Sequence, residues 1–478
     1  GLGIPAAVLG KYLQRQERLN TTRIKSPASI LEAFFAAREL DGQPLDEIKL
    51  VFVGRGAAGK TTLAHRLIRN RFKRGTRETQ GVDISRWPLR CGERDIDVNV
   101  WDFAGQVVTH STHQFFLSES SVYVLVLTGR EDTQKTDADY WLRLIRAFAT
   151  DSSGTTSPVI VVLNKYEEHP FKVDRNALRE KYPFIAYFIE TDCKSGLGIG
   201  ELRQRLSETV WAMPIVQQRF KLAWWRIKEK LEKAQRKQNY LPYSTFQNIC
   251  AQQGEQDPEL QRFLADVFHA LGVALNFGND ERLRNATVLN PRWVTESIYK
   301  LLREGVLDDG WAELTAGRVS EVLPNEPEVM RTYLVELMRR FDLAFPVNEQ
   351  GGRWLVPQRL PSEQPDLGEE WYGLTDATRL RYSYPVIPEG LLPRFISRTY
   401  PLSEGEDGAP PLPRWANGVV LQDRGARALV RVDSEERRID ITCKGRKEER
   451  LFLLGVIQAD FRSLHEQIAG LDQTEELE

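Results

Sequence analysis

Residues 48–62 read IKLVFVGRGAAGKTT, and this stretch decides the fold of the first part of the chain. Val, Phe, Ile and Leu dominate residues 48–53, which predicts a buried strand. A glycine turn follows, and residues 60–72 then carry apolar side chains at helical spacing. Gly54 to Thr61 fit the pattern G-x-x-x-x-G-K-[ST], which binds phosphate groups when it joins a strand to a helix. The sequence therefore predicts a phosphate-binding loop here.

Strands and helices alternate along the next part of the chain. Apolar runs at residues 98–103, 122–127 and 159–163 predict three more strands, and the last two are apolar throughout, as parallel strands covered on both faces tend to be. A helical stripe over residues 138–149 lies between them, and a further strand is expected at residues 186–190. Such alternation is typical of an α/β domain with a mostly parallel sheet and helices on both faces.

The loop supplies the groups that a polyphosphate and its metal need. Glycines let backbone N–H groups turn inward around phosphate oxygens without a Cβ in the way. Lys60 is expected to neutralise the β- and γ-phosphate oxygens, and Thr61 to offer its hydroxyl to Mg²⁺. The N-terminus of the helix adds partial positive charge. The predicted phosphate-binding residues are Gly54, Gly56, Ala57, Ala58, Gly59, Lys60, Thr61 and Thr62.

A second motif, D-x-x-G-Q, follows the strand expected at residues 98–103. Asp102 is predicted to hold Mg²⁺ through water, and Gly105 to present its backbone N–H to the γ-phosphate. Gln106 has the length and the amide to orient an attacking water. Thr79, between the two motifs, is predicted to add a second hydroxyl to Mg²⁺; its alternative is a solvated loop threonine before a glycine turn. The motifs in this order predict hydrolysis of a nucleoside triphosphate.

Two segments at the ends of later strands suit a guanine base. Asn164 and Lys165, after the strand at residues 159–163, are predicted to contact the base, and Cys193 and Lys194 to contact it from a later loop. The carboxylate of Glu167 can accept hydrogen bonds from both N1 and N2 of guanine, a donor pair that adenine lacks. Aspartate is the usual residue at that position, and the extra methylene is expected to loosen the geometry. GTP and GDP are therefore the expected ligands, and an ATPase is the disfavoured alternative.

Beyond residue 213 the sequence pattern changes twice. A basic amphipathic helix is expected at residues 220–237, and helical patterns dominate to about residue 345. After residue 380, short β-branched runs at residues 418–421, 428–432 and 438–442 precede a last helix expected at about residues 451–470. The α/β domain is therefore expected to be followed by a mostly helical region, and then by an antiparallel sheet closed by a helix.

Composition excludes several classes of protein. The 478 residues carry 65 Lys+Arg against 67 Asp+Glu, so no overall basic field attracts nucleic acid, and no direct nucleic-acid binding is expected. The longest apolar runs are too short to be transmembrane segments. The four cysteines form no close pair, which excludes a disulfide scaffold and predicts a cytoplasmic protein. The chain has no initiator Met and no signal segment, so we expect an internal fragment.

Together these motifs resemble those of Ras-like small GTPases, and the stretches around them resemble the Roco family, in which a Roc GTPase domain precedes a COR domain. The Roc-like stretches are residues 81–88 and 110–116, and the COR-like stretches are residues 271–277, 289–295 and 415–421. The likeness runs from about residue 26 to 470, and it departs from the family at Glu167 and at Val107, where an acidic residue often follows the glutamine. It implies a linker from an upstream leucine-rich-repeat region at residues 1–25, Roc at 26–213, a mostly helical COR-A at 214–378 and an α+β COR-B at 379–478.

The resemblance also implies an activity and an assembly. A slow, Mg²⁺-dependent GTPase is expected, forming a homodimer through COR, chiefly through its C-terminal half, with assembly coupled to the nucleotide state. Arg130, at the carboxyl edge of the sheet, is a candidate arginine finger acting within the chain or across a dimer. The alternative is a dimerisation scaffold in which the nucleotide is structural and turnover is negligible. The complete loop motif and Gln106 argue against it.

Overall fold

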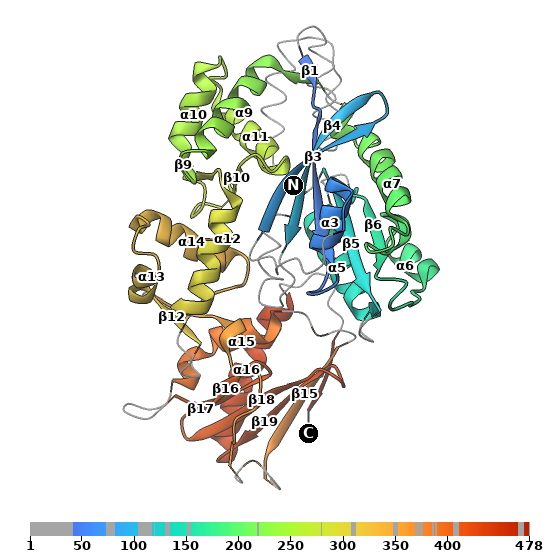
Figure 1. Cartoon of the computed structure of the whole chain (residues 1–478). Helices are drawn as coiled ribbons and strands as arrows, with labels where there is room; N and C mark the ends of the chain where they lie inside the picture. The colour runs from blue at the N-terminus through green and yellow to red at the C-terminus, as the bar shows by residue number, and fades with distance from the viewer. Residues whose placement is uncertain are drawn as a thin grey trace, which may run out of the picture. The chain divides into compact units, whose positions relative to one another are not determined.

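The chain folds into two compact units, Gly1–Glu296 and Ser297–Glu478, in a computed structural model (Figure 1). Each unit is described below by itself. The described residues are 42–72, 82–103, 117–118, 120–129, 134–150, 154–217, 219–278, 280–306, 312–347, 352–368, 371, 376–384, 387, 390–404, 411–466 and 473–477.

A six-stranded sheet in the order β3-β4-β2-β5-β6-β7 forms the centre of the first unit. Neighbouring strands from β4 to β7 run parallel, and β3 pairs antiparallel with β4 at the edge. All residues of β2 and β6 are buried, as the continuous apolar runs predict for strands covered on both faces. The strands are β2 (Glu47–Val53), β3 (Val82–Cys91), β4 (Arg94–Phe103), β5 (Ser121–Thr128), β6 (Val159–Asn164) and β7 (Ile185–Thr191).

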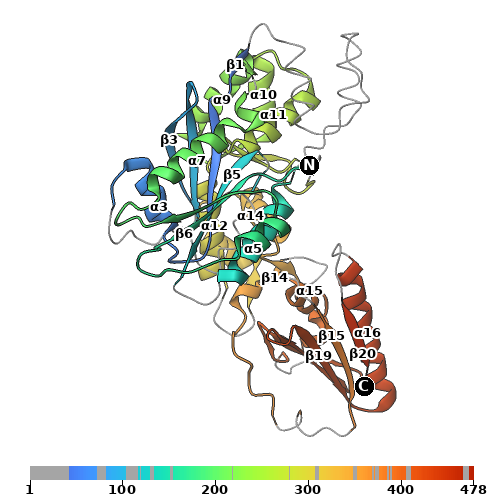
Figure 2. The ribbon, with the colours of Figure 1, turned by 90° about the vertical axis from the view of Figure 1, so that its right-hand side faces the viewer.

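Helices cover both faces of this sheet, with α3 and α5 on opposite sides (Figure 2). Alternate residues of β2 point to opposite faces, so Leu50 and Phe52 pack with α3 and α7 in one hydrophobic cluster. The helix predicted at residues 60–72 ends earlier, at Arg69, because Asn70 adopts a left-handed conformation with φ of 51° and caps it. The helices are α3 (Lys60–Arg69), α5 (Gln134–Phe148), α6 (Arg175–Lys181) and α7 (Ile199–Trp211).

The helices that follow the α/β domain share its hydrophobic core. A single cluster of buried side chains runs from Leu45 through the sheet to Leu289. Trp224, on the helix predicted at residues 220–237, is fully buried, and its indole N–H donates to Glu255 over 2.9 Å. This part contains α8 (Pro214–Gln217), α9 (Leu222–Gln235), α10 (Tyr243–Gln252) and α11 (Pro258–Ala270), the pair β1 (Gly42–Pro44) and β8 (Arg219–Lys221), and the sheet of β10 (Leu275–Asn276), β11 (Ala286–Val288) and β9 (Tyr240–Pro242).

Helices and a small sheet begin the second unit. Helix α12 (Pro291–Lys300) crosses the boundary between the units. It is followed by the π-helix η3 (Leu301–Gly305), α13 (Ala316–Val322) and α14 (Glu328–Arg340), and by a sheet of β12 (Glu313–Thr315), β14 (Arg353–Leu355) and β13 (Phe345–Pro346).

An antiparallel six-stranded sheet in the order β16-β17-β18-β19-β15-β20 completes the second unit. Helices α15 (Leu391–Arg398) and α16 (Lys447–Glu466) pack together, with the rings of Phe395 and Phe461 stacked 4.3 Å apart. Within the described residues α16 begins four residues before the predicted start, because Glu448 and Glu449 suit the positive end of a helix. The strands are β15 (Thr378–Ser383), β16 (Arg414–Trp415), β17 (Gly418–Asp423), β18 (Ala426–Asp433), β19 (Arg438–Lys444) and β20 (Thr474–Leu477).

The predicted fold class is confirmed. The first domain is α/β with a mostly parallel sheet, the next region is mostly helical, and the last is an antiparallel sheet with a closing helix. The elements without a counterpart among the predicted strands and helices include β3, β15, α6, α7 and α15. Among the described residues, no helix combines the length and the apolar character needed to cross a membrane.

Candidate nucleotide site

The loop from Gly54 to Gly59 has a backbone that only glycine suits at its two ends. Gly54 has φ of 137°, and a Cβ there would lie 2.3 Å from the carbonyl oxygen of Val126. Gly59 has φ of 92°, and its Cβ would lie 2.5 Å from Nδ2 of Asn164. Both distances are too short for any side chain. The motif glycines are therefore required by the neighbouring strand ends as well as by the phosphates they are expected to surround.

Lys60 opens helix α3 and folds back over the loop. Its side chain is buried, and Nζ donates to the carbonyl oxygens of Gly54 at 2.7 Å and Arg55 at 2.8 Å. The ammonium group therefore lies beside the helix N-terminus, where the helix dipole adds positive charge. This arrangement concentrates positive potential in the loop and suits a bound anion.

The two motifs of the sequence meet at Thr61 and Asp102. The Thr61 hydroxyl donates to Oδ2 of Asp102 over 2.5 Å, and Asp102 is buried at the carboxyl end of β4. A hydroxyl and a carboxylate oxygen are the hard ligands that Mg²⁺ prefers, and Mg²⁺ commonly takes few protein ligands beside phosphate oxygens and water. No cluster of three or more His, Cys, Asp or Glu side chains that could hold a metal occurs within the described part of the chain. The residues at this point fit Mg²⁺.

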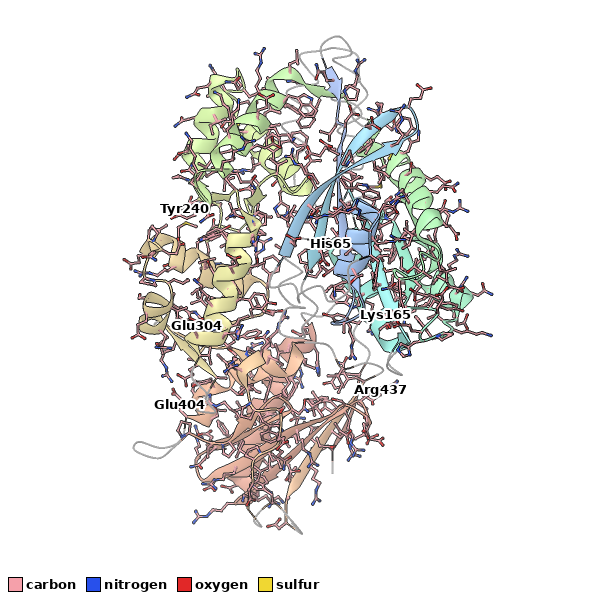
Figure 3. All side chains as sticks on the ribbon, viewed as in Figure 1. His65, Lys165, Tyr240, Glu304, Glu404 and Arg437 are labelled. Carbon is pink, nitrogen blue, oxygen red and sulfur yellow. The ribbon has the colours of Figure 1, made fainter. Side chains whose placement is uncertain are left out.

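Asn164 and Lys165 connect the end of β6 to the loop. Nδ2 of Asn164 donates to the carbonyl oxygen of Ala58 at 2.8 Å, and Nζ of Lys165 donates to that of Ala57 at 2.6 Å. Figure 3 labels Lys165 within the α/β domain. Thr191, at the end of β7, donates from Oγ1 to Oδ1 of Asn164 over 3.1 Å. The ends of β6 and β7 and the loop are thus joined by side chains.

The last predicted base-contacting residues differ in exposure. Cys193 is buried with Sγ 3.7 Å from Oδ1 of Asn164, and burial raises the pKa of its thiol to about 12. The thiol therefore stays protonated and packs, instead of acting as a nucleophile. Lys194 and Glu167 are both exposed. Asp192 shapes the turn, because its Oδ1 accepts from the backbone N–H groups of residues 194 and 195.

The sequence placed Thr191 and Asp192 in the segment expected to contact the base, but it did not predict their roles, which are to hold Asn164 and to shape the turn. A threonine at the end of a strand is a weak signal by itself. An aspartate two residues before a turn residue is also weak, although it is typical of an Asx turn. Four predicted site residues, Thr79, Gly105, Gln106 and Arg130, lie outside the described residues.

A buried charge network connects the sheet to helix α9. Nζ of Lys228 lies 2.7 Å from Oε2 of Glu47 on β2 and 3.0 Å from Oε1 of Glu232, and Nδ2 of Asn99 on β4 donates to Glu47. Burial alone would lower the pKa of Lys228, but the adjacent carboxylates of Glu47 and Glu232 outweigh it and raise the pKa. Glu232 in turn pairs with Arg86 of β3 at 2.6 Å. Strands β2 and β3, which lie next to the predicted phosphate- and metal-binding segments, thus contact α9 through charged groups, and Asn99 of β4 supports Glu47.

A second buried contact lies beside Asp102. The Trp101 indole is fully buried, and Nζ of Lys49 lies 4.4 Å from its ring centre. Burial lowers the pKa of Lys49 to about 7. Gly272, after α11, has φ of 72°, and a Cβ there would lie 2.7 Å from Cζ2 of Trp101. The loop after α11 therefore packs its backbone against the residue that precedes Asp102.

Family models match three successive parts of the chain. Residues 49–167 match the Roc model, described as "Ras of Complex, Roc, domain of DAPkinase". Residues 222–360 match the COR-A domain and residues 375–477 the COR-B domain, both described as C-terminal of Roc.

Two curated relatives match most of the chain. A Roc-COR-CHAT protease of Runella zeae is 26% identical over 445 residues, which cover 89% of this chain and 46% of the relative. The probable serine/threonine-protein kinase pats1 of Dictyostelium discoideum is 24% identical over 445 residues, covering 84% of this chain and 14% of the relative. The chain therefore spans less than half the length of either relative.

A solved structure agrees with these matches. The RocCORdC structure of Methanosarcina barkeri Roco2, bound to GDP, is 36% identical with a TM-score of 0.61, and the match covers 68% of this chain and 99% of that one. From this likeness and the three matched domains, the chain belongs to the Roco family and consists of a Roc GTPase domain followed by a COR domain.

Proposed function

We propose that this chain binds GTP with Mg²⁺ and slowly hydrolyses GTP to GDP. The observation that carries the proposal is the contact between Thr61 and Asp102, whose oxygens lie 2.5 Å apart beside the buried Lys60. A hydroxyl, a carboxylate and an ammonium group are the side chains that Mg²⁺-dependent phosphoryl transfer uses in P-loop proteins. The GDP bound to the Methanosarcina barkeri relative supports the same site in this chain.

Each predicted residue has a separate role in this proposal. The loop residues and Lys60 bind the phosphates, and Thr61, Thr79 and Asp102 hold the metal. When bound, Mg²⁺ neutralises charge on the phosphate oxygens. Gln106 orients the attacking water and Gly105 donates its N–H to the γ-phosphate, with Arg130 as the second candidate for stabilising negative charge.

The base-binding part of the proposal assigns guanine specificity. Asn164 holds the loop and the end of β7 in place through its hydrogen bonds with Ala58 and Thr191. Lys165, Cys193 and Lys194 border the base, and the exposed carboxylate of Glu167 accepts from guanine. Competition of ATP against labelled GDP tests this assignment, because adenine cannot supply the two donors that Glu167 accepts.

We also propose that the nucleotide state is coupled to COR, and that COR forms a homodimer chiefly through its C-terminal half. The Arg86–Glu232 and Lys228–Glu47 pairs support coupling, since they tie the strands that flank the metal-binding segments to α9. The proposed parts are a linker from upstream leucine-rich repeats at residues 1–25, Roc at 26–213, COR-A at 214–378 and COR-B at 379–478. A cytoplasmic location belongs to the same proposal.

The alternative is a dimerisation scaffold with a structural nucleotide and negligible turnover. Single-turnover GTP hydrolysis, measured beside light scattering with GDP and with a GTP analogue, separates the two functions. Turnover with a nucleotide-dependent change in mass supports the switch, and absence of both supports the scaffold. The Gln106→Leu variant should slow hydrolysis while keeping GTP binding. An unchanged rate would move the water-positioning role to another residue, with Arg130 as the next to test.

A further inference from the structure

The antiparallel sheet of the second unit has one apolar and one cationic face. Leu380 and Tyr382 on β15, with Ile439 and Ile441 on β19, are buried, and Tyr382 packs 5.2 Å from Phe461 of α16. Because successive strand residues point to opposite faces, the residues between them lie on the face away from α16. Those residues on β15 are Arg379 and Arg381, and on β19 they are Arg438, Asp440 and Thr442.

Strand register gathers these side chains around Asp440. Asp440 is the cross-strand partner of Arg381 on β15 and of Arg431 on β18, and Arg379 pairs with Thr442. Arg381 also lies opposite Glu476 of the edge strand β20. Together with Arg438 these residues line a cavity of about 210 Å³ on the sheet face.

Asp440 holds two of the guanidinium groups in place. Its Oδ1 accepts from Nε of Arg381 at 2.8 Å, and its Oδ2 accepts from Nε of Arg438 at 3.0 Å. A carboxylate that binds two arginines in this way fixes their planes, and oriented guanidinium groups suit phosphate oxygens better than a mobile lysine does. Arg431, on the other side of Asp440, is exposed.

The charges that line the cavity do not balance. Among the lining side chains four arginines meet two carboxylates, Asp440 and Glu476, which leaves two positive charges in excess in the lining; Asp433, outside it, lies 3.5 Å from Nη2 of Arg438. The chain as a whole has a formal net charge of −2, so this excess is local. A compact dianion matches it in charge, and the cavity is smaller than the roughly 300–1,000 Å³ pockets that hold drug-sized ligands.

We propose that this cavity in COR-B binds a small molecule through a doubly charged phosphate group. The site is distinct from the Roc nucleotide site and does not depend on the function proposed for that site. Arg431 and Arg438 bind the phosphate oxygens, Asp440 orients the arginines, and Thr442 adds a hydroxyl donor. Glu476 opposes the anion from the edge strand.

Inorganic phosphate is the probe for the first experiment. The full chain is loaded with a non-hydrolysable GTP analogue and Mg²⁺, so that the phosphate positions of the Roc loop are filled, and phosphate is titrated by calorimetry. The expected result is saturable binding of one phosphate per chain, weakening as KCl is raised. Absence of saturable binding overturns the proposal. If the chain does not retain the GTP analogue, the function proposed for Roc is contradicted, independently of the phosphate titration. Phosphate binding to the cavity is then measured in the Lys60→Ala variant.

Paired variants assign the binding to the cavity. Arg431→Gln with Arg438→Gln should weaken phosphate binding by about tenfold or more, because two charge-assisted contacts are lost. Arg424→Gln with Arg437→Gln makes the same change in net charge at exposed positions outside the cavity and should leave the affinity within about twofold. Equal losses in the two double variants would overturn the assignment.

The Glu476→Gln variant tests the sign of the charge effect without touching the arginines. All four residues of β20 are exposed, so the substitution removes a charge without opening a core. Phosphate should bind several-fold more tightly, because one opposing carboxylate is gone. Weaker or unchanged binding in a variant with an unaltered melting temperature would contradict the proposed cavity.

Discussion

The sheet of the Roc domain is mostly parallel and buried on both faces, whereas the sheet of COR-B is antiparallel and buries one face. All residues of β2 are buried, while along β19 buried residues alternate with partly exposed ones. A sheet covered on both sides can offer chemical groups only at the ends of its strands, and there Asp102, Asn164 and Thr191 lie. A sheet with one open face can offer them along its length, as the arginines around Asp440 do.

This difference determines whether a mutation in each site also affects the stability of the fold. The Roc site is held by backbone conformation and by buried side chains, so changing one residue is expected to disturb both folding and ligand binding. The COR-B face is held by strand pairing beneath it, and its polar side chains can change with little effect on stability. Four predictions test this contrast, from the largest expected effect to the smallest.

The largest effect is expected at Lys60. The Lys60→Ala variant should lower GDP affinity by about a hundredfold or more, because hydrogen bonds from a charged group contribute roughly 1.5–3 kcal/mol each. Binding of a fluorescent GDP derivative measures it. Lys172→Ala, at an exposed position of the same domain, is the matched control and should bind like the wild type. Nanomolar GDP affinity in the Lys60 variant would rule out the loop as the phosphate site.

The next effect concerns stability. Lys228→Met leaves the buried carboxylate of Glu47 without its closest cation and should lower the free energy of unfolding of the first unit by about 3–5 kcal/mol. Lys233→Met on the same helix, at an exposed position, should change it by about 0.5 kcal/mol or less. Urea denaturation compares the two variants. Similar losses of free energy of unfolding in both variants would mean that the Lys228–Glu47 pair stabilises the fold no more than an exposed lysine does.

The effect of pH on stability is expected to be smaller per pH unit and to depend on Lys49. Burial lowers its pKa to about 7 from the usual 10.5, so between these values the unfolded chain binds a proton that the folded chain does not. Stability should therefore fall as the pH drops from about 10.5 to 7, by up to ~1.4 kcal/mol per pH unit from this group, and change no further below that.

The Lys49→Met variant isolates this contribution. Its free energy of unfolding should exceed that of the wild type at pH 7, and the difference should shrink toward pH 10. Lys233→Met, at an exposed position of α9, should show no such pH dependence relative to the wild type. A constant difference between Lys49→Met and the wild type across this range would contradict the lowered pKa.

The smallest effect is expected on the open face of COR-B. Arg431→Thr puts a β-branched residue on an exposed position of β18 and should change the free energy of unfolding of the second unit by about 0.5 kcal/mol or less. Thermal melting measures it. A loss comparable to that at Lys228 would show that the arginine face stabilises the sheet, and would remove the contrast between the two sheets.

Much of the Roc domain could be predicted because its signals are local in the sequence. The loop from Gly54 to Thr61 needs particular residue types at fixed spacing, and apolar strands such as β5 stand out by composition. Strand β3 escaped prediction because, as an edge strand, it mixes buried Trp87 and Leu89 with exposed polar residues. Strand β15 alternates arginine with apolar residues, which lowers its average hydrophobicity.

The contacts between distant parts of the chain could not be predicted in the same way. Nothing near Glu47 in the sequence indicates that its partner is Lys228, since the pairing depends on how α9 packs on the sheet. The cavity around Asp440 depends on the register of β15, β18, β19 and β20, which alternation within one strand does not determine. A lone lysine in the apolar run at residues 48–53 was the available signal for the Lys49–Trp101 contact.

The approach of Gly272 to the Trp101 indole has a consequence for how the chain tolerates mutation. On the Gly272 side the contact is made by backbone atoms, so only the rotamer of Trp101 determines it. Position 272 itself combines a left-handed φ with no room for a Cβ. In a saturation-mutagenesis library of the residues that follow α11, position 272 should lose nearly every substitution, whereas exposed positions such as Glu281 and Arg284 should retain most of theirs.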